Sequence, residues 1–184
     1  MGIKFLDCTL RDGGYYNNWD FPISLIEEYL VAMDAVDIDY VELGFRSLNT
    51  IGFKGACAYT TDSFIRSLSV PAGLNLGVML NASELHSFQA GPIEAIKQLF
   101  APAAESPVSL VRIACHKYEF LATLPICNYL KSVGYKVGIN LMQIADCPDV
   151  EIKNSGFELA LDYQSDQNGD FSYNFGGNIS LTDN

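Results

Sequence analysis

Two adjacent residues of opposite charge, Arg11 and Asp12, follow an apolar run in the stretch "KFLDCTLRDGGYYNNWDF" near the start of the chain. A third charged residue, Glu42, lies inside the apolar run "YVELGFR". A charge within an apolar strand is costly to bury unless it is paired, so Arg11 and Glu42 are natural partners. Asp12 is then free to bind a hard divalent cation such as Mg²⁺ or Mn²⁺. An arginine beside that cation would stabilise the oxyanion of an enolate formed from a bound 2-oxo acid.

Each of these three residues also has a structural interpretation. Arg11 and Glu42 would serve equally as an ion pair that closes the floor or rim of the fold. Asp12 would serve as a helix or loop cap, although the following Gly13-Gly14 pair favours a turn that faces a ligand.

Four further residues are candidates for substrate binding, and each lies in a predicted strand or in the segment that follows one. The candidates are Tyr15, Arg46, His116 and Asn140. Tyr15 is expected either to line the substrate pocket or to cover the mouth of the barrel. Arg46 is expected either to bind a carboxylate of the substrate or to be a solvated charge in a loop. His116 contacts substrate or is a hydrogen-bonded strand-end histidine, and Asn140 reaches the pocket or is a buried strand amide.

Apolar runs that alternate with helical patterns predict the elements that must position these residues. Strands are expected over residues 4–10, 40–45, 74–80, 109–115 and 136–143. Helices are expected over residues 22–35, 61–68, 82–100 with an interruption at 90–92, and 120–133. The pattern is typical of an α/β fold with about five parallel strands and covering helices. In such folds the site lies at the carboxyl ends of the strands, which is where Arg11, Asp12 and His116 are expected.

The character of the sequence changes after Asp146. We therefore predict two parts, a βα domain over residues 1–146 and a tail over residues 147–184. The tail contains one weak helical pattern at residues 150–163. Its last twenty residues are rich in Gly, Asn, Asp and Ser, which is typical of loop or disorder.

The composition argues against nucleic acid and membranes as partners. The 184 residues carry a net charge of −11, which disfavours nucleic acid and anionic membrane surfaces because both require a basic footprint. No apolar run is long enough to span a membrane, and the first residues do not resemble a signal peptide. The five cysteines are widely spaced and include no C-x-x-C pair, so we expect reduced thiols and a cytoplasmic location.

The stretch "LDCTLRDGG", together with "VELGF", resembles the DRE-TIM metallolyases, a superfamily of metal-dependent lyases and acyltransferases built on a TIM barrel. The resemblance implies that Asp12 is a metal ligand, that Arg11 stabilises the enolate, and that Glu42 orients Arg11. The stretches "RIACHKYE" and "GYKVGINLMQ" are most similar to the 4-hydroxy-2-oxovalerate aldolase branch. The resemblance covers roughly residues 4–146 and implies a partial TIM barrel acting on a small-molecule oxo acid.

The sequence also departs from that family in two respects. The family's His-x-His metal ligands are absent, because the two histidines, His86 and His116, lie thirty residues apart. Tyr15 occupies the position where the aldolase branch has a histidine that acts as a base.

Two functions therefore stay open for the chain. The first is a divalent-metal-dependent aldolase or lyase that breaks or forms a carbon–carbon bond of a 2-oxo acid or related acyl substrate through an enolate. The second is a catalytically inactive half-barrel that serves as a binding or assembly module, or a fragment of a longer enzyme. A half-barrel would expose apolar sheet edges, so we expect either a homo-oligomer or a partner chain that completes the barrel.

Overall fold

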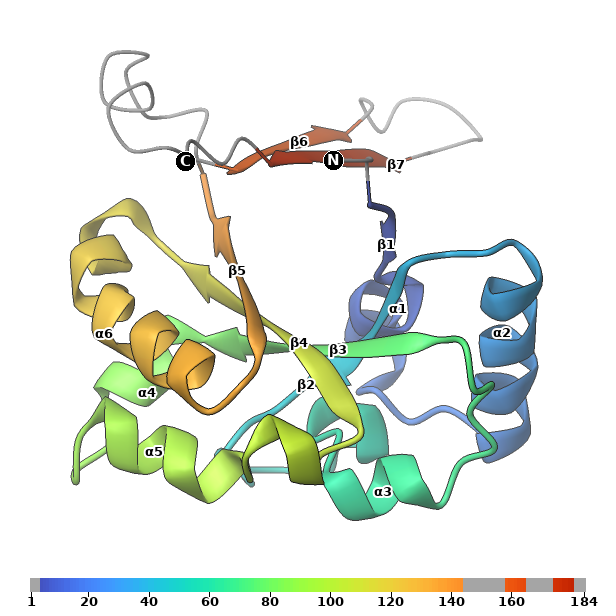
Figure 1. Cartoon of the computed structure of the whole chain (residues 1–184), viewed down its shortest axis with the longest axis horizontal. Helices are drawn as coiled ribbons and strands as arrows, with labels where there is room; N and C mark the ends of the chain where they lie inside the picture. Colours follow the sequence, from blue (N-terminus) through green and yellow to red (C-terminus); the bar gives the residue numbers. More distant parts are fainter. Residues whose placement is uncertain (1–3, 144–157, 165–173, 181–184) are drawn as a thin grey trace.

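The computed structural model describes residues 4–143, 158–164 and 174–180 of the chain. Five parallel strands form one sheet in the order β1-β2-β3-β4-β5. Their bounds are β1 Leu6–Asp7, β2 Tyr40–Phe45, β3 Asn75–Asn81, β4 Val108–Cys115 and β5 Lys136–Leu141. The sheet curls into a half-barrel with helices around its outer side (Figure 1). The predicted fold class, a partial α/β barrel with about five parallel strands, is confirmed.

Six helices connect or follow these strands in the described part of the chain. They are α1 Thr9–Asn17, α2 Ile23–Ala35, α3 Asp62–Arg66, α4 Ala82–His86, α5 Pro92–Leu99 and α6 Phe120–Ser132. Three single 3₁₀ turns lie at η1 Ala56–Ala58, η2 Ala103–Glu105 and η3 Lys117–Glu119. The predicted interruption at residues 90–92 separates α4 from α5, and Gly91 there has a φ of 91°, which disfavours any other residue. None of the helices in the described residues combines the length and apolarity that crossing a bilayer requires.

Strand alternation divides the side chains between two faces. Val41, Leu43 and Val78 belong to the large core between the sheet and the outer helices. A smaller cluster of Phe45, Met79 and Ala114 lies apart from that core. Because successive strand residues point to opposite faces, Glu42 lies on the concave face opposite Val41 and Leu43.

The first strand is much shorter than the sequence predicted. A strand was expected over residues 4–10, but β1 ends at Asp7 and α1 begins at Thr9. The Asp7 carboxylate accepts hydrogen bonds from the backbone N–H of Thr9, at 2.9 Å, and from its hydroxyl, at 3.2 Å. An aspartate that bonds two residues ahead turns the backbone out of the strand. Arg11 and Asp12 therefore lie in the first turn of a helix and not at a strand end.

The tail also differs from the prediction. Residues 158–163, predicted as the end of a helix, belong to β6 Glu158–Gln164, and β7 Asn174–Ser180 falls where loop or disorder was expected. The two strands pair antiparallel, from Glu158 opposite Ser180 to Gln164 opposite Asn174. The alternation of Leu159, Leu161 and Tyr163 with smaller or polar residues has the period of a strand, which the prediction overlooked. The start of the predicted helix and the boundary after residue 146 lie outside the described residues.

Candidate active site

A buried carboxylate joins two arginines on the concave face of the sheet. Glu42, in β2, is 0% exposed. Its Oε1 accepts a hydrogen bond from Nε of Arg11 at 2.7 Å. Both of its oxygens lie 3.3 Å from one terminal nitrogen of Arg112, in β4. On the intervening strand β3 the register partner of Glu42 is Gly77, a position that carries no side chain. The predicted Arg11–Glu42 pair is thus present, with a second arginine added.

Asp12 lies beside this cluster and faces solvent. Its side chain is 55% exposed, and its carboxylate forms an ion pair with the terminal nitrogens of Arg11. Burial by itself lowers the pKa of the Arg11 guanidinium, but the charges of Glu42 and Asp12 raise it above its ordinary value. Arg11 therefore stays charged, with Glu42 behind it and Asp12 at its solvent side.

Cys8 is a further neighbour of Asp12. Its thiol lies 3.2 Å from Oδ2 of Asp12, which is within the distance of a hydrogen bond that involves sulfur. Burial is the largest cause that raises the pKa of the Cys8 thiol; Arg11 lowers it, Asp12 raises it, and the net value is about 12. The thiol is therefore protonated at neutral pH and donates to Asp12.

Three aromatic rings form a cluster that contacts Arg11 through Phe45 and Trp19. The centroid of Tyr15, which is 64% exposed, lies 4.8 Å from that of Trp19 and 6.2 Å from that of Phe45. Trp19 and Phe45 lie 5.5 Å apart, and the Arg11 guanidinium is 5.9 Å from the centre of the Phe45 ring. Tyr15 is therefore a neighbour of Arg11, one helical turn further along α1. We call the group of Arg11, Asp12 and Glu42 the Arg11 corner.

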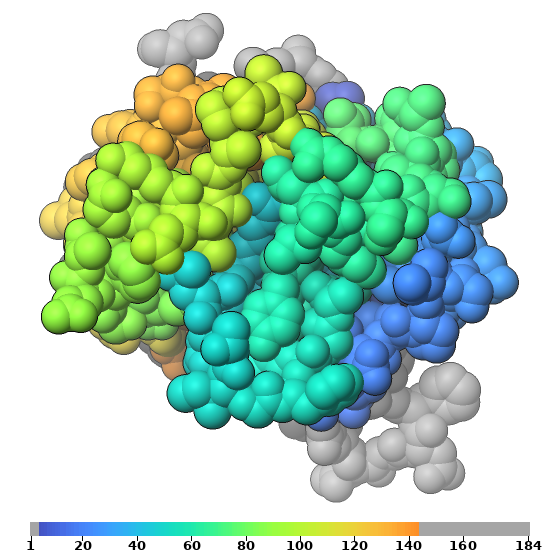
Figure 2. All heavy atoms as spheres, turned by 90° about the horizontal axis from the view of Figure 1, so that it is seen from below, coloured from blue at the N-terminus to red at the C-terminus, as the bar shows by residue number. Residues whose placement is uncertain are grey.

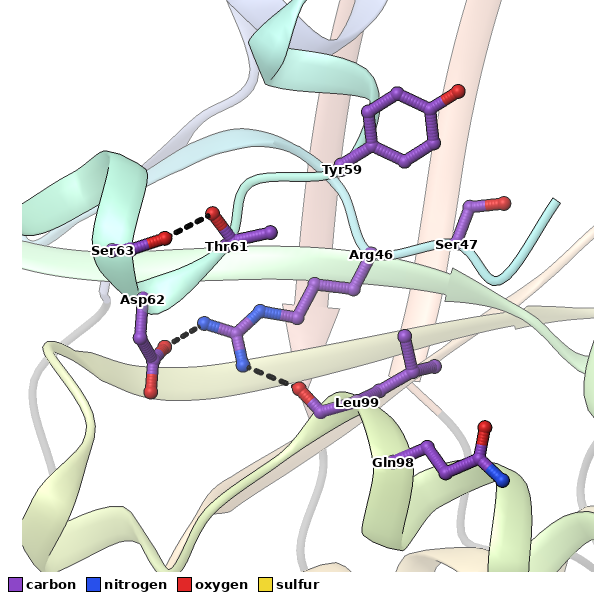
Figure 3. Close-up of a pocket in the computed structure, with 8 residues that line it drawn as sticks. All are labelled: Arg46, Ser47, Tyr59, Thr61, Asp62, Ser63, Gln98 and Leu99. Carbon is purple, nitrogen blue, oxygen red and sulfur yellow. Dashed lines mark hydrogen bonds and ion pairs between the residues drawn. The ribbon is translucent and has the colours of Figure 1, made fainter. Parts of the chain in front are cut away.

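Arg46 lies away from this corner, among the outer helices. Its guanidinium donates to the carbonyl of Thr60 at 3.0 Å and to that of Leu99 at 2.9 Å, and it forms an ion pair with Asp62. Together with other polar side chains it lines a pocket of about 390 Å³ (Figure 3). Figure 2 views the molecule from this side, where the surface is hollowed between α3 and α5. Arg46 is 3% exposed, and its guanidinium is held by these contacts within the protein.

The two remaining predicted residues follow or belong to the last strands. The backbone N–H of His116 donates to the carboxylate of Glu119 at 2.8 Å, and its ring stacks on Tyr118 with centroids 5.3 Å apart. Asn140 pairs in register with Ala114, so it shares the concave face with the smaller apolar cluster. No hydrogen bond joins His116 or Asn140 to the Arg11–Glu42 pair among the described residues.

The side chains near Asp12 offer few ligands for a divalent cation. Such a cation takes six or more oxygen ligands, or several nitrogen and oxygen ligands, from groups that converge on one point. Nowhere in the described residues do three or more His, Cys, Asp or Glu side chains group closely enough to hold a metal ion. Asp12 is a single carboxylate already engaged by Arg11 and Cys8. These residues do not form a metal site by themselves.

Sequence reasoning missed Arg112, Cys8 and Trp19. Arg112 was detectable, because it is a charged residue inside the apolar run "LVRIAC", the same signal that identified Glu42. The role of Cys8 depends on a helix that places it four residues before Asp12 on one face, and a strand was predicted there. Nothing in the sequence indicates where the Trp19 ring lies.

Comparison with known proteins indicates similarity to lyase- and aldolase-type proteins. The chain is 25% identical over 140 residues to an oxaloacetate decarboxylase of Mycobacterium tuberculosis, a match that spans 75% of this chain and 38% of that protein. Among solved structures it resembles the N-terminal domain of a candidate aldolase from Bacteroides vulgatus, with a TM-score of 0.66 and 28% identity. That match covers 84% of this chain and 50% of the other. The chain thus spans half or less of the length of both relatives. No known family profile matches it.

Proposed function

We propose that the chain belongs to an aldolase- or lyase-type enzyme of the DRE-TIM kind. Such an enzyme breaks or forms a carbon–carbon bond of a 2-oxo acid or related acyl substrate through an enolate. The observation that carries this proposal is the buried Glu42 that holds Arg11 beside the exposed Asp12. A carboxylate buried at 0% exposure and shared by two arginines fixes the direction of the guanidinium in advance. The similarity to an oxaloacetate decarboxylase and to a candidate aldolase supports the same class of reaction.

Arg11 is the proposed catalytic group in this reaction. Cleavage of the bond between C3 and C4 of the 2-oxo acid leaves its electron pair on C3. Conjugation with the C2 carbonyl places that negative charge on the carbonyl oxygen, giving an enolate. Arg11 uses Nε for Glu42 and its terminal nitrogens for Asp12. Each terminal nitrogen carries two N–H groups, and in this proposal one that does not bind Asp12 donates to the enolate oxygen. Preorganised donors of this kind lower the barrier because they need no rearrangement when the charge develops.

The other predicted site residues take supporting roles in the proposal. Glu42 positions Arg11, and Tyr15 and Asn140 border the concave face on which the substrate would lie. His116 remains a proposed substrate contact from the end of β4. Arg46 is proposed only as a remote group, because its guanidinium is engaged among the outer helices.

A divalent metal, Mn²⁺ or Mg²⁺, stays part of the proposal as a prediction. Asp12 is the ligand that this proposal takes from the described residues, so the others would come from substrate oxygens, from residues outside the described ranges or from another chain. A thermal melt with Mn²⁺ tests this point, because a ligand at about 100 times its Kd raises the free energy of unfolding by about 2.7 kcal/mol. We expect the increase in wild type and its loss in Asp12→Asn.

The proposed activity is tested by pyruvate release from oxaloacetate, followed with lactate dehydrogenase and NADH, in the presence of Mn²⁺. We expect release above the spontaneous rate in wild type, and a loss of about a hundredfold or more in Arg11→Lys, since lysine cannot keep both contacts. Arg66→Lys, an exposed arginine in α3, is the matched control and should retain wild-type activity.

A second candidate function is an inactive half-barrel that serves as a binding or assembly module. The observation behind it is the engagement of the Asp12 carboxylate by Arg11 and Cys8, which gives this carboxylate protein partners without a metal ion. A chain that melts cooperatively but releases no pyruvate beyond the spontaneous rate, with Arg11→Lys indistinguishable from wild type, would favour this candidate over the enzyme.

A further inference from the structure

Trp19 adopts a backbone conformation that is unusual for a bulky residue. Asn18, the residue that follows helix α1, has a φ of 58°, and Trp19 after it has a φ of 58° as well. A left-handed conformation is strained for a large L-residue and persists only where the surroundings hold it. The backbone N–H of Trp19 donates to the carbonyl of Gly14 at 2.9 Å, which folds the chain back onto α1.

This conformation lays the indole against the first turns of α1. The indole N–H donates to the carbonyl of Arg11 at 2.9 Å. The ring covers Gly14 so closely that a Cβ at that position would lie 1.9 Å from a ring carbon. The indole therefore holds the helix at the residue that carries the guanidinium and again three residues later.

The other side of Trp19 is held by segments from β2 and the loop after it. Its ring lies 5.5 Å from Phe45, the same ring that underlies the Arg11 guanidinium. Gly55 donates its N–H to the carbonyl of Asn18 at 2.8 Å, and a Cβ on Gly55 would lie 2.1 Å from the carbonyl oxygen of Trp19. Trp19 thus joins α1, the end of β2 and this loop at one point.

We infer that Trp19 is a positioning residue that sets the orientation of Arg11 toward Glu42. The indole N–H fixes the Arg11 backbone, and the ring fixes the distance between α1 and Phe45. Rotation of α1 about its axis would move the Arg11 side chain away from Glu42, and the indole opposes that rotation. The inference rests on the proposed function in that Arg11 is taken as the oxyanion-binding group.

The test measures the Arg11 side chain directly and needs no turnover. The Nε–H of Arg11, hydrogen-bonded to Glu42, is observed by ¹⁵N–¹H NMR and assigned by its absence in Arg11→Lys. Its hydrogen-exchange rate is compared between wild type and Trp19→Phe, which keeps an aromatic ring and removes the N–H donor. The Nε–H of Arg46, which donates to the Thr60 carbonyl at 3.0 Å and is remote from Trp19, is the internal control.

We expect the Arg11 Nε–H of Trp19→Phe to exchange about fivefold faster or more, the effect of losing one ordinary hydrogen bond, while Arg46 is unchanged. If the phenylalanine variant does not fold, β-(3-benzothienyl)alanine at this single tryptophan position removes the N–H and keeps the bicyclic ring. Unchanged exchange at Arg11, or equal acceleration at Arg11 and Arg46, overturns the positioning role. Failure of the proposed activity alone, seen as no pyruvate release by wild type, leaves this comparison valid.

Discussion

Ion pairs join the residues of the Arg11 corner, and Glu42 is the residue that holds both Arg11 and Arg112 in place. It is fully buried and contacts both Arg11 and Arg112. Removing one partner of a buried ion pair leaves an uncompensated charge, which is much more destabilising than losing a pair at the surface. The same residue therefore contributes to stability and to the direction of the Arg11 guanidinium.

Glu42→Gln tests this dependence, because glutamine keeps the size of the side chain and removes its charge. We expect the free energy of unfolding, measured with urea, to fall by about 3 kcal/mol. Glu94→Gln is the control, because Glu94 forms an exposed pair with Lys97 at 2.6 Å and should change stability by less than about 0.5 kcal/mol. Equal losses in the two variants would contradict the central role of Glu42.

At the scale of the element, helix α1 determines where the Arg11 corner lies. Two glycines in this helix have different surroundings. A Cβ on Gly14 would lie 1.9 Å from the Trp19 ring, whereas a Cβ on Gly13 would make only an ordinary contact with Phe21 at 3.8 Å. Gly14 is therefore required by packing, and Gly13 is not.

This difference gives a matched pair of variants. We expect Gly13→Ala to stabilise the protein by about 0.5–1 kcal/mol, because alanine favours a helix over the unfolded chain. Gly14→Ala should destabilise it by about 1–3 kcal/mol, because the indole must move. Urea titrations of both variants provide the comparison, and stabilisation by Gly14→Ala would show that the indole does not lie against α1.

The sequence predicted most elements but not α1. β2 matches its predicted range, and the other long strands shift by at most two residues at either end, because continuous apolar runs between helical patterns mark buried parallel strands. The partners Arg11 and Glu42 were predictable because buried charges need opposite charges. Helix α1 was missed because its start depends on the Asp7 side chain and its packing on Trp19, and neither contact follows from apolar periodicity.

At the scale of the whole molecule, the open half-barrel leaves the outer edge of β1 without a strand neighbour among the described residues. Helix α2 also exposes apolar side chains, including Ile23 at 54% and Val31 at 58%. Unpaired edges and exposed apolar surface favour association. We expect light scattering after size exclusion to show a homo-oligomer of the isolated chain, and a monomer at every concentration would contradict this.

The stability of the whole molecule should also depend on pH through its buried thiols. Burial raises the pKa of Cys57 to about 11 and of Cys115 to about 11, from an ordinary value of 9.0, and Glu119 adds to the effect at Cys115. Above about pH 9 the unfolded chain loses thiol protons that the folded chain keeps, so the free energy of unfolding falls as pH rises toward 11. Well below pH 9 these thiols are protonated in both the folded and the unfolded chain, so they do not make the free energy of unfolding depend on pH.

Urea midpoints between about pH 8 and about pH 11 measure this effect. The double variant Cys57→Ala, Cys115→Ala should show a shallower decline than wild type. A decline of the same steepness in both proteins would assign it to other groups.

We propose that Arg11, held by Glu42, stabilises the enolate of a 2-oxo acid. The most direct test of this proposal is the exchange of the pyruvate methyl protons in D₂O. Enolate formation replaces these protons by deuterium, which ¹H NMR follows without knowledge of the second substrate. With Mn²⁺ present, we expect wild type to accelerate the exchange and Arg11→Lys to lose about a hundredfold or more of that acceleration. Exchange at the buffer rate with wild type, or equal acceleration by Arg11→Lys, would contradict the claim.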